Sequence, residues 1–271
     1  MSLAGVVLAG GIGSRLAPLT SRVPKPLLRV GGRSLLSRQV AQLRTAGAET
    51  IYVTLHHQAA KVARHLEREA PGVVYRIEPE LTGPAGALLL LADLLGGCEA
   101  VLVASCDVLV GDGLAGLAAA RRDDDAALTF GAAATAGARH YGVLDVGPDG
   151  ALSAAREKPD VPDHEVHLVS AGVYCMRSDV IETIGRLANS ADTVDYARDL
   201  APDLLAAGER VTAHRLGGYW RDVGTPASLM AARRDAREGR IPPLSGLARR
   251  SRREARPALG DRAVAGVEVP R

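Results

Sequence analysis

The chain has 271 residues and a formal net charge of +2 at pH 7, with 47% hydrophobic and 24% charged residues. These values are ordinary for a soluble globular protein and do not indicate nucleic-acid binding by the main part of the chain. No apolar run reaches the roughly 18 residues of a membrane span, and Met1 leads into an apolar stretch with no charged leader before it, so a cytoplasmic protein is expected.

Strands and helices are predicted to alternate through the first half of the chain. The expected strands are short and apolar: 3–9, 50–55, 73–77 and 100–104. The expected helices show helical spacing of apolar residues: 34–46, 59–69, 84–95 and 114–122. Ser34 is expected to cap the first of these helices and Gly47 to end it. This alternation is typical of a parallel sheet covered by helices on both faces.

The pattern changes after residue 125. Three strand-like segments and a turn at 147–150 predict an inserted antiparallel hairpin region: 126–134, 143–146 and 151–155. The sheet is expected to resume at 168–176. Two helices, a strand and a last helix are predicted to follow: 178–187, 194–207, 211–216 and 225–238. The expected fold class is therefore α/β, with a Rossmann-like mixed but mainly parallel sheet.

A glycine-rich loop, Gly10-Gly11-Ile12-Gly13-Ser14-Arg15, follows the first strand, and Lys25 stands between two prolines soon after it. Backbone N–H groups of such a loop can form an anion-binding concavity, to which Arg15 and Lys25 add charge. The dinucleotide fingerprint is incomplete because Leu16 replaces its last glycine, and the lysine of the ATPase loop is missing. The loop predicts a nucleotide site, although a plain glycine-rich turn remains an alternative.

Two carboxylates are candidates for a divalent cation. Asp107 directly follows the strand expected to end at residue 104, at the edge of the sheet where ligands bind. Asp222 precedes the last helix, and Thr225 is the better cap for that helix, which leaves Asp222 free. A role as a helix cap or turn residue is the alternative for Asp107.

These motifs together resemble the sugar-1-phosphate nucleotidyltransferases, and most closely their mannose-1-phosphate guanylyltransferase-like members. The matching segments are 8–20, 24–28, 83–88, 105–107, 141–143, 157–159, 170–174 and 220–226. The resemblance covers residues 1–238, which it implies are a catalytic domain of the nucleotide-diphospho-sugar transferase type. Residues 239–271 form an arginine- and proline-rich extension, expected to be solvated chain or a remnant of the β-helix that many family members carry.

The resemblance implies a role for each matching residue. It makes three residues catalytic: Arg15, Lys25 and Asp107. It implies nucleotide binding by Leu8, Ala9, Gly10, Gly11, Gly13, Ser14, Arg15, Lys25, Gly83 and Gly86. It implies sugar-phosphate binding by Gly142, Glu157, Lys158, Ser170 and Gly172. It implies Mg²⁺ as the cofactor, held by Asp107 and Asp222. Ser170 stands where asparagine is usual, which puts the identity of the sugar in doubt.

The implied reaction transfers a nucleotidyl group from a nucleoside triphosphate to a sugar 1-phosphate and releases pyrophosphate. The segment 78–88 favours GTP, with UTP, ATP and dTTP left open. A catalytically silent nucleotide-sugar-binding subunit is a second hypothesis, although it would be expected to lack Lys25, Asp107 or Asp222. The incomplete fingerprint argues against a dinucleotide-dependent oxidoreductase. No nucleic-acid or membrane partner is expected, and self-association is left open.

The three cysteines show no metal-ligand spacing, so free thiols are expected: Cys98, Cys106 and Cys175. Cys106, beside Asp107, is the one that could be interpreted as a nucleophile. No histidine lies near it in the sequence, and the implied reaction needs no covalent intermediate.

Overall fold

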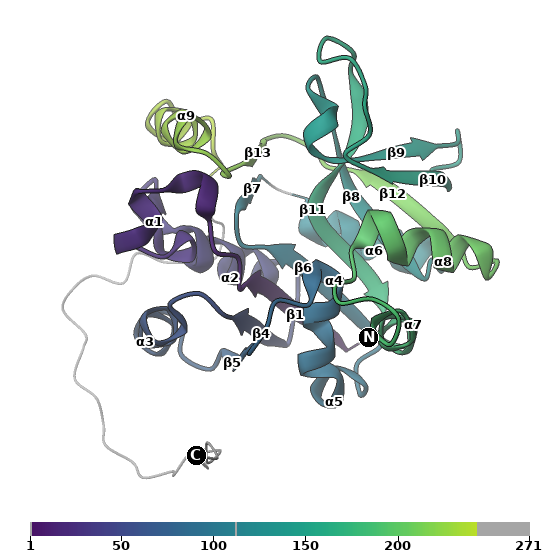
Figure 1. Ribbon diagram of the computed structural model, residues 1–271, viewed down its shortest axis with the longest axis horizontal. Coiled ribbons are helices and arrows are strands. Elements are labelled where there is room, and N and C mark those ends of the chain that lie inside the picture. The colour runs from purple at the N-terminus through teal and green to yellow at the C-terminus, as the bar shows by residue number, and fades with distance from the viewer. Residues whose placement is uncertain (1, 112, 243–271) are drawn as a thin grey trace.

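The computed structural model describes residues 2–111 and 113–242. They are organised around one mixed sheet of nine strands (Figure 1). The extension at 243–271, with its arginine-rich run, lies outside the described residues.

One half of the sheet is parallel. Its strands lie in the order β5 (Val74–Ile77), β4 (Thr50–Leu55), β1 (Leu3–Ala9) and β6 (Ala100–Ser105). Alternate residues of β1 join two separate hydrophobic clusters, because successive side chains of a strand point to opposite faces. The sheet is therefore buried on both sides, as the alternation of strands and helices predicts.

Helices cover both faces of this sheet. The helices that contribute to one cluster include α2 (Leu35–Thr45), α3 (Ala59–Glu69) and α6 (Leu114–Asp123). Those that contribute to the other are α4 (Gly83–Gly86), α5 (Ala92–Leu95), α7 (Val180–Ala188) and α8 (Ala201–Ala206). No helix in the described parts of the chain is both long and apolar enough to cross a membrane.

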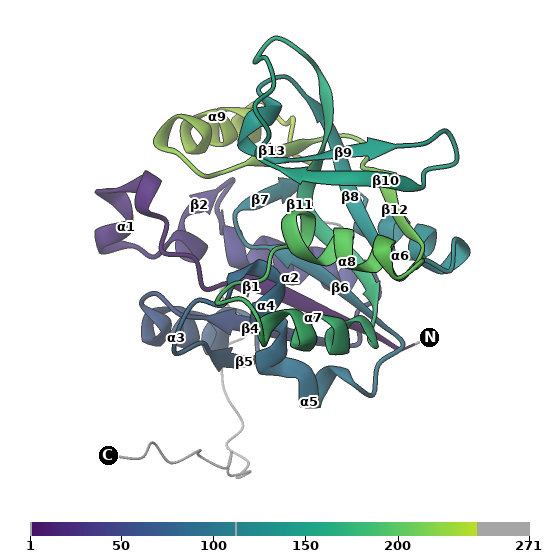
Figure 2. The same ribbon diagram turned by 45° about the vertical axis from the view of Figure 1, so that its right-hand side comes forward.

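The other half of the sheet is built around the long strand β11 (His167–Arg177). β11 runs antiparallel to β6 and also pairs with β8 (Leu128–Thr135), which is parallel to β12 (Val211–Arg215). The predicted hairpin is formed by β9 (Gly142–Val146) and β10 (Leu152–Glu157), and it joins β11 through a single pair of residues. In Figure 2 this hairpin extends away from the parallel strands and lies above α8.

Most predicted elements are confirmed, and α2 shows why. The Ser34 hydroxyl accepts a hydrogen bond from the backbone N–H of Ser37, and Gly47 follows the helix with φ +93°. The last helix, α9 (Pro226–Arg237), has Thr225 as its N-cap in a reciprocal capping box with Ser228.

Two predicted helices are not continuous. Residues 84–95 are divided among α4, a 3₁₀ segment and α5, because the backbone leaves the helical region at Leu91. The Arg76 guanidinium donates a hydrogen bond to the neighbouring Leu90 carbonyl. Residues 194–207 begin with an extended Asp195, continue as a π-turn and end as α8. Pro202 lacks the N–H that would close a regular helical bond in this segment.

Several short elements were not predicted. Two of them are ribbons: β2 (Arg29–Val30) with β3 (Arg33–Ser34), and β7 (Val108–Val110) with β13 (Trp220–Asp222). A short helix, α1 (Leu19–Arg22), follows the glycine loop. Strands of two or three residues carry no measurable periodicity, so hydrophobic patterning could not reveal them.

Candidate active site

The ends of two parallel strands lie side by side at the edge of the sheet. β1 and β6 are adjacent, with Leu8 opposite Ser105. The glycine loop leaves the end of β1, and Asp107 follows the end of β6 after one intervening residue. Ligands in open α/β sheets bind beyond the carboxyl ends of the strands, so this edge is the expected place for one.

Gly13 lets the loop fold back on the segment that carries Lys25. Its backbone has φ +69°, and a Cβ there would lie 3.1 Å from Thr20 Cγ2 and 3.2 Å from Lys25 Cβ. The Thr20 hydroxyl donates a hydrogen bond to the Gly13 carbonyl at 3.0 Å. A side chain at position 13 would be disfavoured both by the backbone conformation and by the lack of space.

Lys25 is largely buried and points toward Asp107. Pro24 and Pro26 flank it and restrict the backbone, and its side chain is only 11% exposed. Its Nζ lies 2.6 Å from Asp107 Oδ2. The ammonium group of Lys25, from the proline-flanked segment, is thus held against the carboxylate of Asp107, which follows β6.

The β7–β13 ribbon brings Asp222 to the same place. β13 ends at Asp222, which pairs in register with Val108 of β7. The Val223 N–H then donates a hydrogen bond to the Asp107 carbonyl at 2.8 Å. The two predicted metal-binding acids are therefore neighbours, although they are far apart in the sequence.

The electrostatics of Asp222 reflect this neighbourhood. Burial and the negative charge of Asp107 raise the pKa of the Asp222 carboxyl, while Lys25 and Arg15 act in the opposite direction. A Cβ on Gly224 would lie 2.6 Å from Asp222 Oδ1 and 3.1 Å from Arg15 Nη2. The bare backbone of Gly224 therefore leaves room for the Arg15 guanidinium beside the acids.

One cavity, of about 290 Å³, opens at the end of the parallel strands. Six of the residues predicted to bind the nucleotide line it: Leu8, Ala9, Gly10, Gly11, Lys25 and Gly83. Gly13 and Ser14 lie in the loop but do not line this cavity, and neither does Gly86, which is buried against Thr82.

Glu78 also lines this cavity and was not among the predicted site residues. It follows the end of β5, only 5% of it is exposed, and burial raises the pKa of its carboxyl. A Cβ on Gly10 would lie 2.8 Å from Glu78 Oε1, so the glycine makes room for the carboxylate. An acid directly after a strand is the same signal that pointed to Asp107, and it could have identified Glu78.

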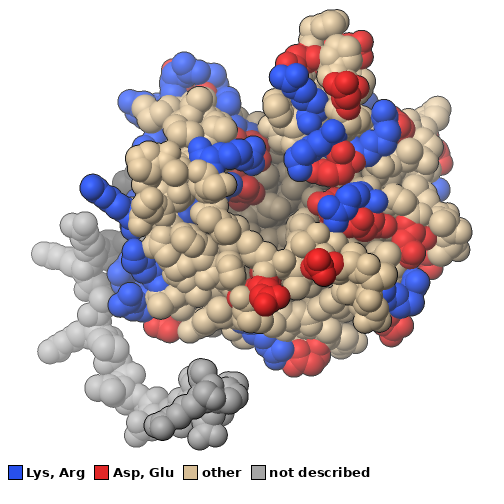
Figure 3. All heavy atoms as spheres, viewed as in Figure 1, with Lys and Arg blue, Asp and Glu red and all other residues tan. Residues whose placement is uncertain are grey.

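A second cavity, of about 210 Å³, lies between β11, the β9–β10 hairpin and β13. All five residues predicted to bind the sugar phosphate line it: Gly142, Glu157, Lys158, Ser170 and Gly172. Arg15 and Asp222 line it too. Asp107 lines both cavities, as do Ser105 and Pro84, so the two cavities meet at Asp107. Figure 3 shows a hollow in this part of the surface with acidic and basic side chains around it.

The wall of the second cavity carries both charged groups and hydroxyl groups. Lys158 is 63% exposed and forms an ion pair with Glu157. The Ser170 hydroxyl donates a hydrogen bond to the Tyr174 hydroxyl oxygen at 3.2 Å, and the Tyr174 ring stacks on Tyr196 with centroids 3.7 Å apart. Serine at 170 thus leaves room for a tyrosine hydroxyl near the cavity wall.

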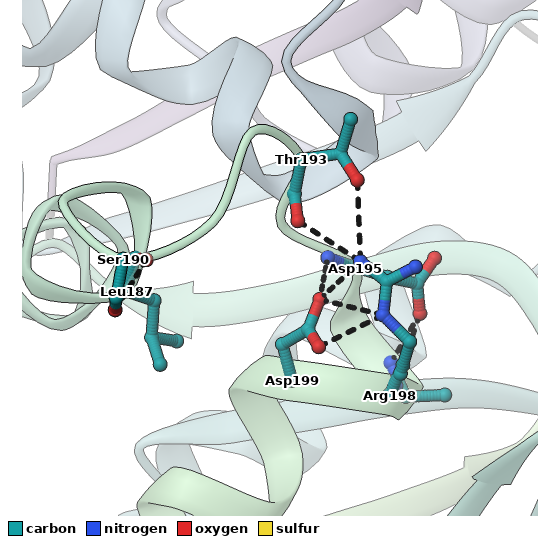
Figure 4. A network of polar contacts seen from close by, with 7 residues as sticks. Leu187, Ser190, Thr193, Asp195, Arg198 and Asp199 are labelled. Atoms are coloured by element: carbon teal, nitrogen blue, oxygen red, sulfur yellow. Dashed lines mark hydrogen bonds and ion pairs between the residues drawn. The ribbon is translucent and has the colours of Figure 1, made fainter.

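Asp195 is a further acid of the second cavity that the sequence analysis missed. Its Oδ1 accepts hydrogen bonds from the N–H groups of Ala197 and Arg198 at 2.8 and 3.1 Å. Figure 4 shows the surrounding network, in which Arg198 bonds both Asp199 and the Thr193 carbonyl. The network fixes the position of Asp195 on the wall of the cavity.

Cys106 lines the first cavity but is a poor nucleophile. Its side chain is buried, and burial together with the charge of Asp107 raises the pKa of the thiol. The reactive form of cysteine is the thiolate, which this environment disfavours.

The donor set at the junction of the cavities fits a magnesium ion bound together with a phosphate ligand. Among residues 2–111 and 113–242, no group of three or more His, Cys, Asp or Glu side chains is arranged to hold a metal. Asp107 and Asp222 supply two carboxylates, and Mg²⁺ in proteins usually takes one or two carboxylates plus phosphate oxygens and waters.

Known proteins are similar to this chain in sequence and in fold. A family model described as nucleotidyl transferase matches residues 4–239. A mannose-1-phosphate guanyltransferase of Yarrowia lipolytica is 29% identical over 84% of this chain and 62% of its own length. A mannose-1-phosphate guanylyltransferase of Mycobacterium tuberculosis is 30% identical over 88% of this chain and 65% of its own.

A Bacillus anthracis structure, provisionally described as a glucose-1-phosphate thymidylyltransferase, superposes with a TM-score of 0.78 at 25% identity. The match covers 90% of this chain and 98% of that one. The chain spans a little over three-fifths of the length of the curated relatives reported above. Because the family model covers most of the chain, this protein belongs to the nucleotidyl transferase family.

Proposed function

We propose that this protein transfers the nucleotidyl group of a nucleoside triphosphate to a sugar 1-phosphate and releases pyrophosphate. One observation carries the proposal: a cavity lined by the glycine loop and a cavity lined by sugar-binding candidates meet at Asp107. A site for two reactants needs such an arrangement, with the reacting atoms close to the shared wall.

In the proposed reaction an oxygen of the sugar 1-phosphate attacks the α-phosphorus while pyrophosphate leaves. The attacking phosphate is already ionised at neutral pH, so no general base is required. The task of the protein is to hold two anions together and to offset their repulsion. In this account Lys25 faces the triphosphate from the first cavity, Arg15 reaches it from the second cavity, which it lines with Asp222, and Lys158 faces the incoming phosphate.

Lys25 and Asp107 act as a pair in this mechanism. The ion pair fixes the Lys25 ammonium where the two cavities meet, so it is in place before substrate arrives. The Lys158–Glu157 pair is more exposed, so we expect Lys158 to exchange this partner for the sugar phosphate. Mg²⁺ bound by Asp107 and Asp222 would offset phosphate charge and orient the triphosphate.

Glu78 favours GTP as the nucleotide. Guanine carries two adjacent donors, N1–H and the exocyclic N2–H₂, which a single carboxylate can accept together. Adenine, uracil and thymine each present one donor beside acceptors on that edge, and these acceptors would face the carboxylate without a bond. Glu78 is a buried carboxylate in the first cavity, so we infer that it contacts the guanine base.

The acids of the second cavity suit sugar hydroxyls. Glu157 and Asp195 provide acceptors on the cavity wall, and Ser170 with Tyr174 provides hydroxyl groups. The relatives named for mannose 1-phosphate support mannose as the sugar. We further propose that the catalytic unit ends near residue 238 and that the enzyme works in the cytoplasm.

A substrate panel tests the proposal. The full chain is incubated with Mg²⁺, each of GTP, UTP, ATP and dTTP, and a set of sugar 1-phosphates, and pyrophosphate release is measured. We expect release to require both substrates and to be fastest with GTP and mannose 1-phosphate. Binding of nucleotide without release for any pair would instead indicate a silent binding subunit.

A further inference from the structure

A second group of basic side chains lies away from the proposed active site. A cavity of about 410 Å³ opens between the β2–β3 hairpin and α9, and its lining is Arg29, Gly31, Gly32, Arg233, Ala236 and Arg237. Among the residues that the structure describes, three guanidinium groups line it and no carboxylate does. Figure 3 shows Lys and Arg side chains gathered over the side of the molecule where α9 lies.

A further guanidinium lies beneath the hairpin. Arg38 is 8% exposed, and its Nε donates to the Val30 carbonyl at 3.0 Å. A Cβ on Gly31, which has φ +57°, would lie 2.6 Å from Arg38 Nη2. Because Gly31 has no side chain, the Arg38 guanidinium has room to lie close to this part of the cavity lining. Burial lowers the pKa of the Arg38 guanidinium, and the nearby charge of Arg33 acts in the same direction.

The arginines of the cavity bond to backbone carbonyls rather than to acids. Arg233 donates to the Arg29 carbonyl at 3.1 Å, and Arg237 donates to the Arg233 carbonyl at 3.3 Å. Within the residues that the structure describes, neither these arginines nor Arg38 forms an ion pair with a carboxylate.

The arginines around Asp235 of the same helix behave differently. Asp235 is buried, and its carboxylate pairs with Arg221 and Arg240 at 2.8 and 3.1 Å. Positive charge near α9 is thus balanced around Asp235 and left unbalanced at the cavity.

We propose that this cavity is a binding site for a compact polyanion of the phosphate class, such as inorganic phosphate or pyrophosphate. Guanidinium groups bind phosphate oxygens through paired hydrogen bonds, and gathered like charges repel one another until an anion joins them. None of the described lining residues has an aromatic ring that could stack on a nucleobase, so the chemistry favours a small oxyanion over a nucleotide.

The position of the cavity gives the anion a structural consequence. The hairpin begins at Arg29, shortly after Lys25, and α9 begins at Pro226, shortly after Asp222. An anion bound by Arg29 and Arg237 would tie together the two segments that carry these active-site side chains.

Calorimetric titration of the full chain with inorganic pyrophosphate, without divalent metal, tests the proposal. The titrated protein carries Lys25→Ala as its background, which weakens pyrophosphate binding at the active site. The binding that remains therefore reports on the arginine-lined cavity. We expect the pyrophosphate affinity of the arginine-lined cavity to fall at least 10-fold when Arg29→Ala and Arg237→Ala are added. These substitutions keep the Arg233 hydrogen bond to the Arg29 carbonyl. Arg234→Ala, on the same helix but outside the cavity lining, should leave it unchanged.

A parallel titration with inorganic phosphate distinguishes the two anions, and the tighter binder identifies the size of the occupant. Equal pyrophosphate affinity in the background and in the Arg29→Ala/Arg237→Ala protein, with both proteins folded by thermal melting, would overturn the proposal. So would the absence of binding at millimolar concentrations of both anions. The measurement needs no turnover, so its outcome is independent of whether the proposed nucleotidyl transfer is correct.

Discussion

The two cavities of the proposed site are built in different ways. The first cavity lies at the ends of parallel strands, and its whole lining comes from the first 107 residues, with the glycine loop and Lys25 on one part of the wall and Glu78 and Asp107 on others. The second cavity is assembled from β9, β10, β11, the turn at Asp195 and β13, which are spread over much of the remaining chain. The loop and Lys25 of the first cavity are suited to the triphosphate that all nucleotide substrates share, whereas the wall of the second cavity is suited to features that differ between sugars.

This contrast suggests that the two cavities have different roles in the reaction. In the first cavity the Lys25 side chain is only 11% exposed and already forms an ion pair with Asp107. The second holds more exposed charge, as Lys158 shows at 63%. Substitution of Lys25 should therefore reduce the rate of the chemical step, and substitution of Lys158 should mainly reduce affinity for the acceptor.

The largest effect is expected from Lys25→Ala. It removes a buried cation beside the reacting phosphates and leaves Asp107 unpaired, so kcat should fall by about 10²–10³-fold. Steady-state pyrophosphate release measures it, and Lys61→Ala, at an exposed lysine on α3, is the matched control. Turnover within a factor of two of wild type in the Lys25→Ala protein would be incompatible with this role.

Lys158→Ala should affect the other reactant. Losing one charge-assisted contact to phosphate is worth about 1.5–3 kcal/mol, or roughly a 10–100-fold rise in KM for the sugar 1-phosphate. KM for GTP should change little. An equal rise in both KM values would show that the two cavities do not divide the substrates as proposed.

Glu78→Gln sharpens the account of base choice. Glutamine places an N–H₂ group against the guanine donors, so kcat/KM for GTP should fall by about 10–100-fold, on the scale of one bidentate base contact. UTP and dTTP should lose much less, since glutamine can accept from N3–H and donate to O4. A nucleotide preference unchanged by the substitution would remove Glu78 from base recognition.

The pH dependence of GTP use gives a check without mutation. Because burial raises the pKa of Glu78, lowering the pH protonates it before an ordinary glutamate would titrate. A protonated carboxyl accepts fewer hydrogen bonds, so the preference for GTP over UTP should narrow as the pH falls. This narrowing should be absent in the Glu78→Gln protein.

The smallest effect concerns stability. The pKa of Asp222 is raised on folding above its usual 3.8, so the folded state binds more protons, and stability is lost as pH rises through this window. Asp222→Asn removes the charged form, and at neutral pH Tm should rise by a few degrees, about 2–4 °C per kcal/mol. The gain should shrink as the pH is lowered toward 4.

The same substitution should greatly reduce activity, because Asp222 is a proposed metal ligand. A melt recorded by differential scanning calorimetry without metal isolates the electrostatic effect. A lower Tm for Asp222→Asn at neutral pH would show that the carboxylate stabilises the fold, contrary to the direction of its pKa shift.

Sequence patterns predicted the parallel half of the fold well. Strands such as 50–55 are buried, rich in β-branched residues and bounded by polar turns, so their pattern is unambiguous. In the antiparallel half the strands and the β9–β10 hairpin were predicted, but the other strand pairs were not. The pairing of β8 with β11 and β12 depends on contacts between distant segments, which local patterns do not encode.

The site shows the same limit. Lys25 and Asp107 were recognised from motifs, and the structure places them 2.6 Å apart. The means by which Asp222 reaches them, the β7–β13 ribbon, is too short to be seen in the sequence. Glu78 was missed although its position directly after β5 could have indicated it, whereas Asp195 is recognised only from the cavity that it lines, and a cavity is a property of the folded chain.

Label transfer is the most direct measurement of the central claim. The full chain is incubated with Mg²⁺, mannose 1-phosphate and GTP labelled at either the α- or the γ-phosphate, and the products are separated. The account predicts that α-label appears in a sugar-linked nucleotide and γ-label in pyrophosphate, in equal amounts. Label released as free nucleotide or inorganic phosphate, or unchanged GTP bound to the protein, would contradict it.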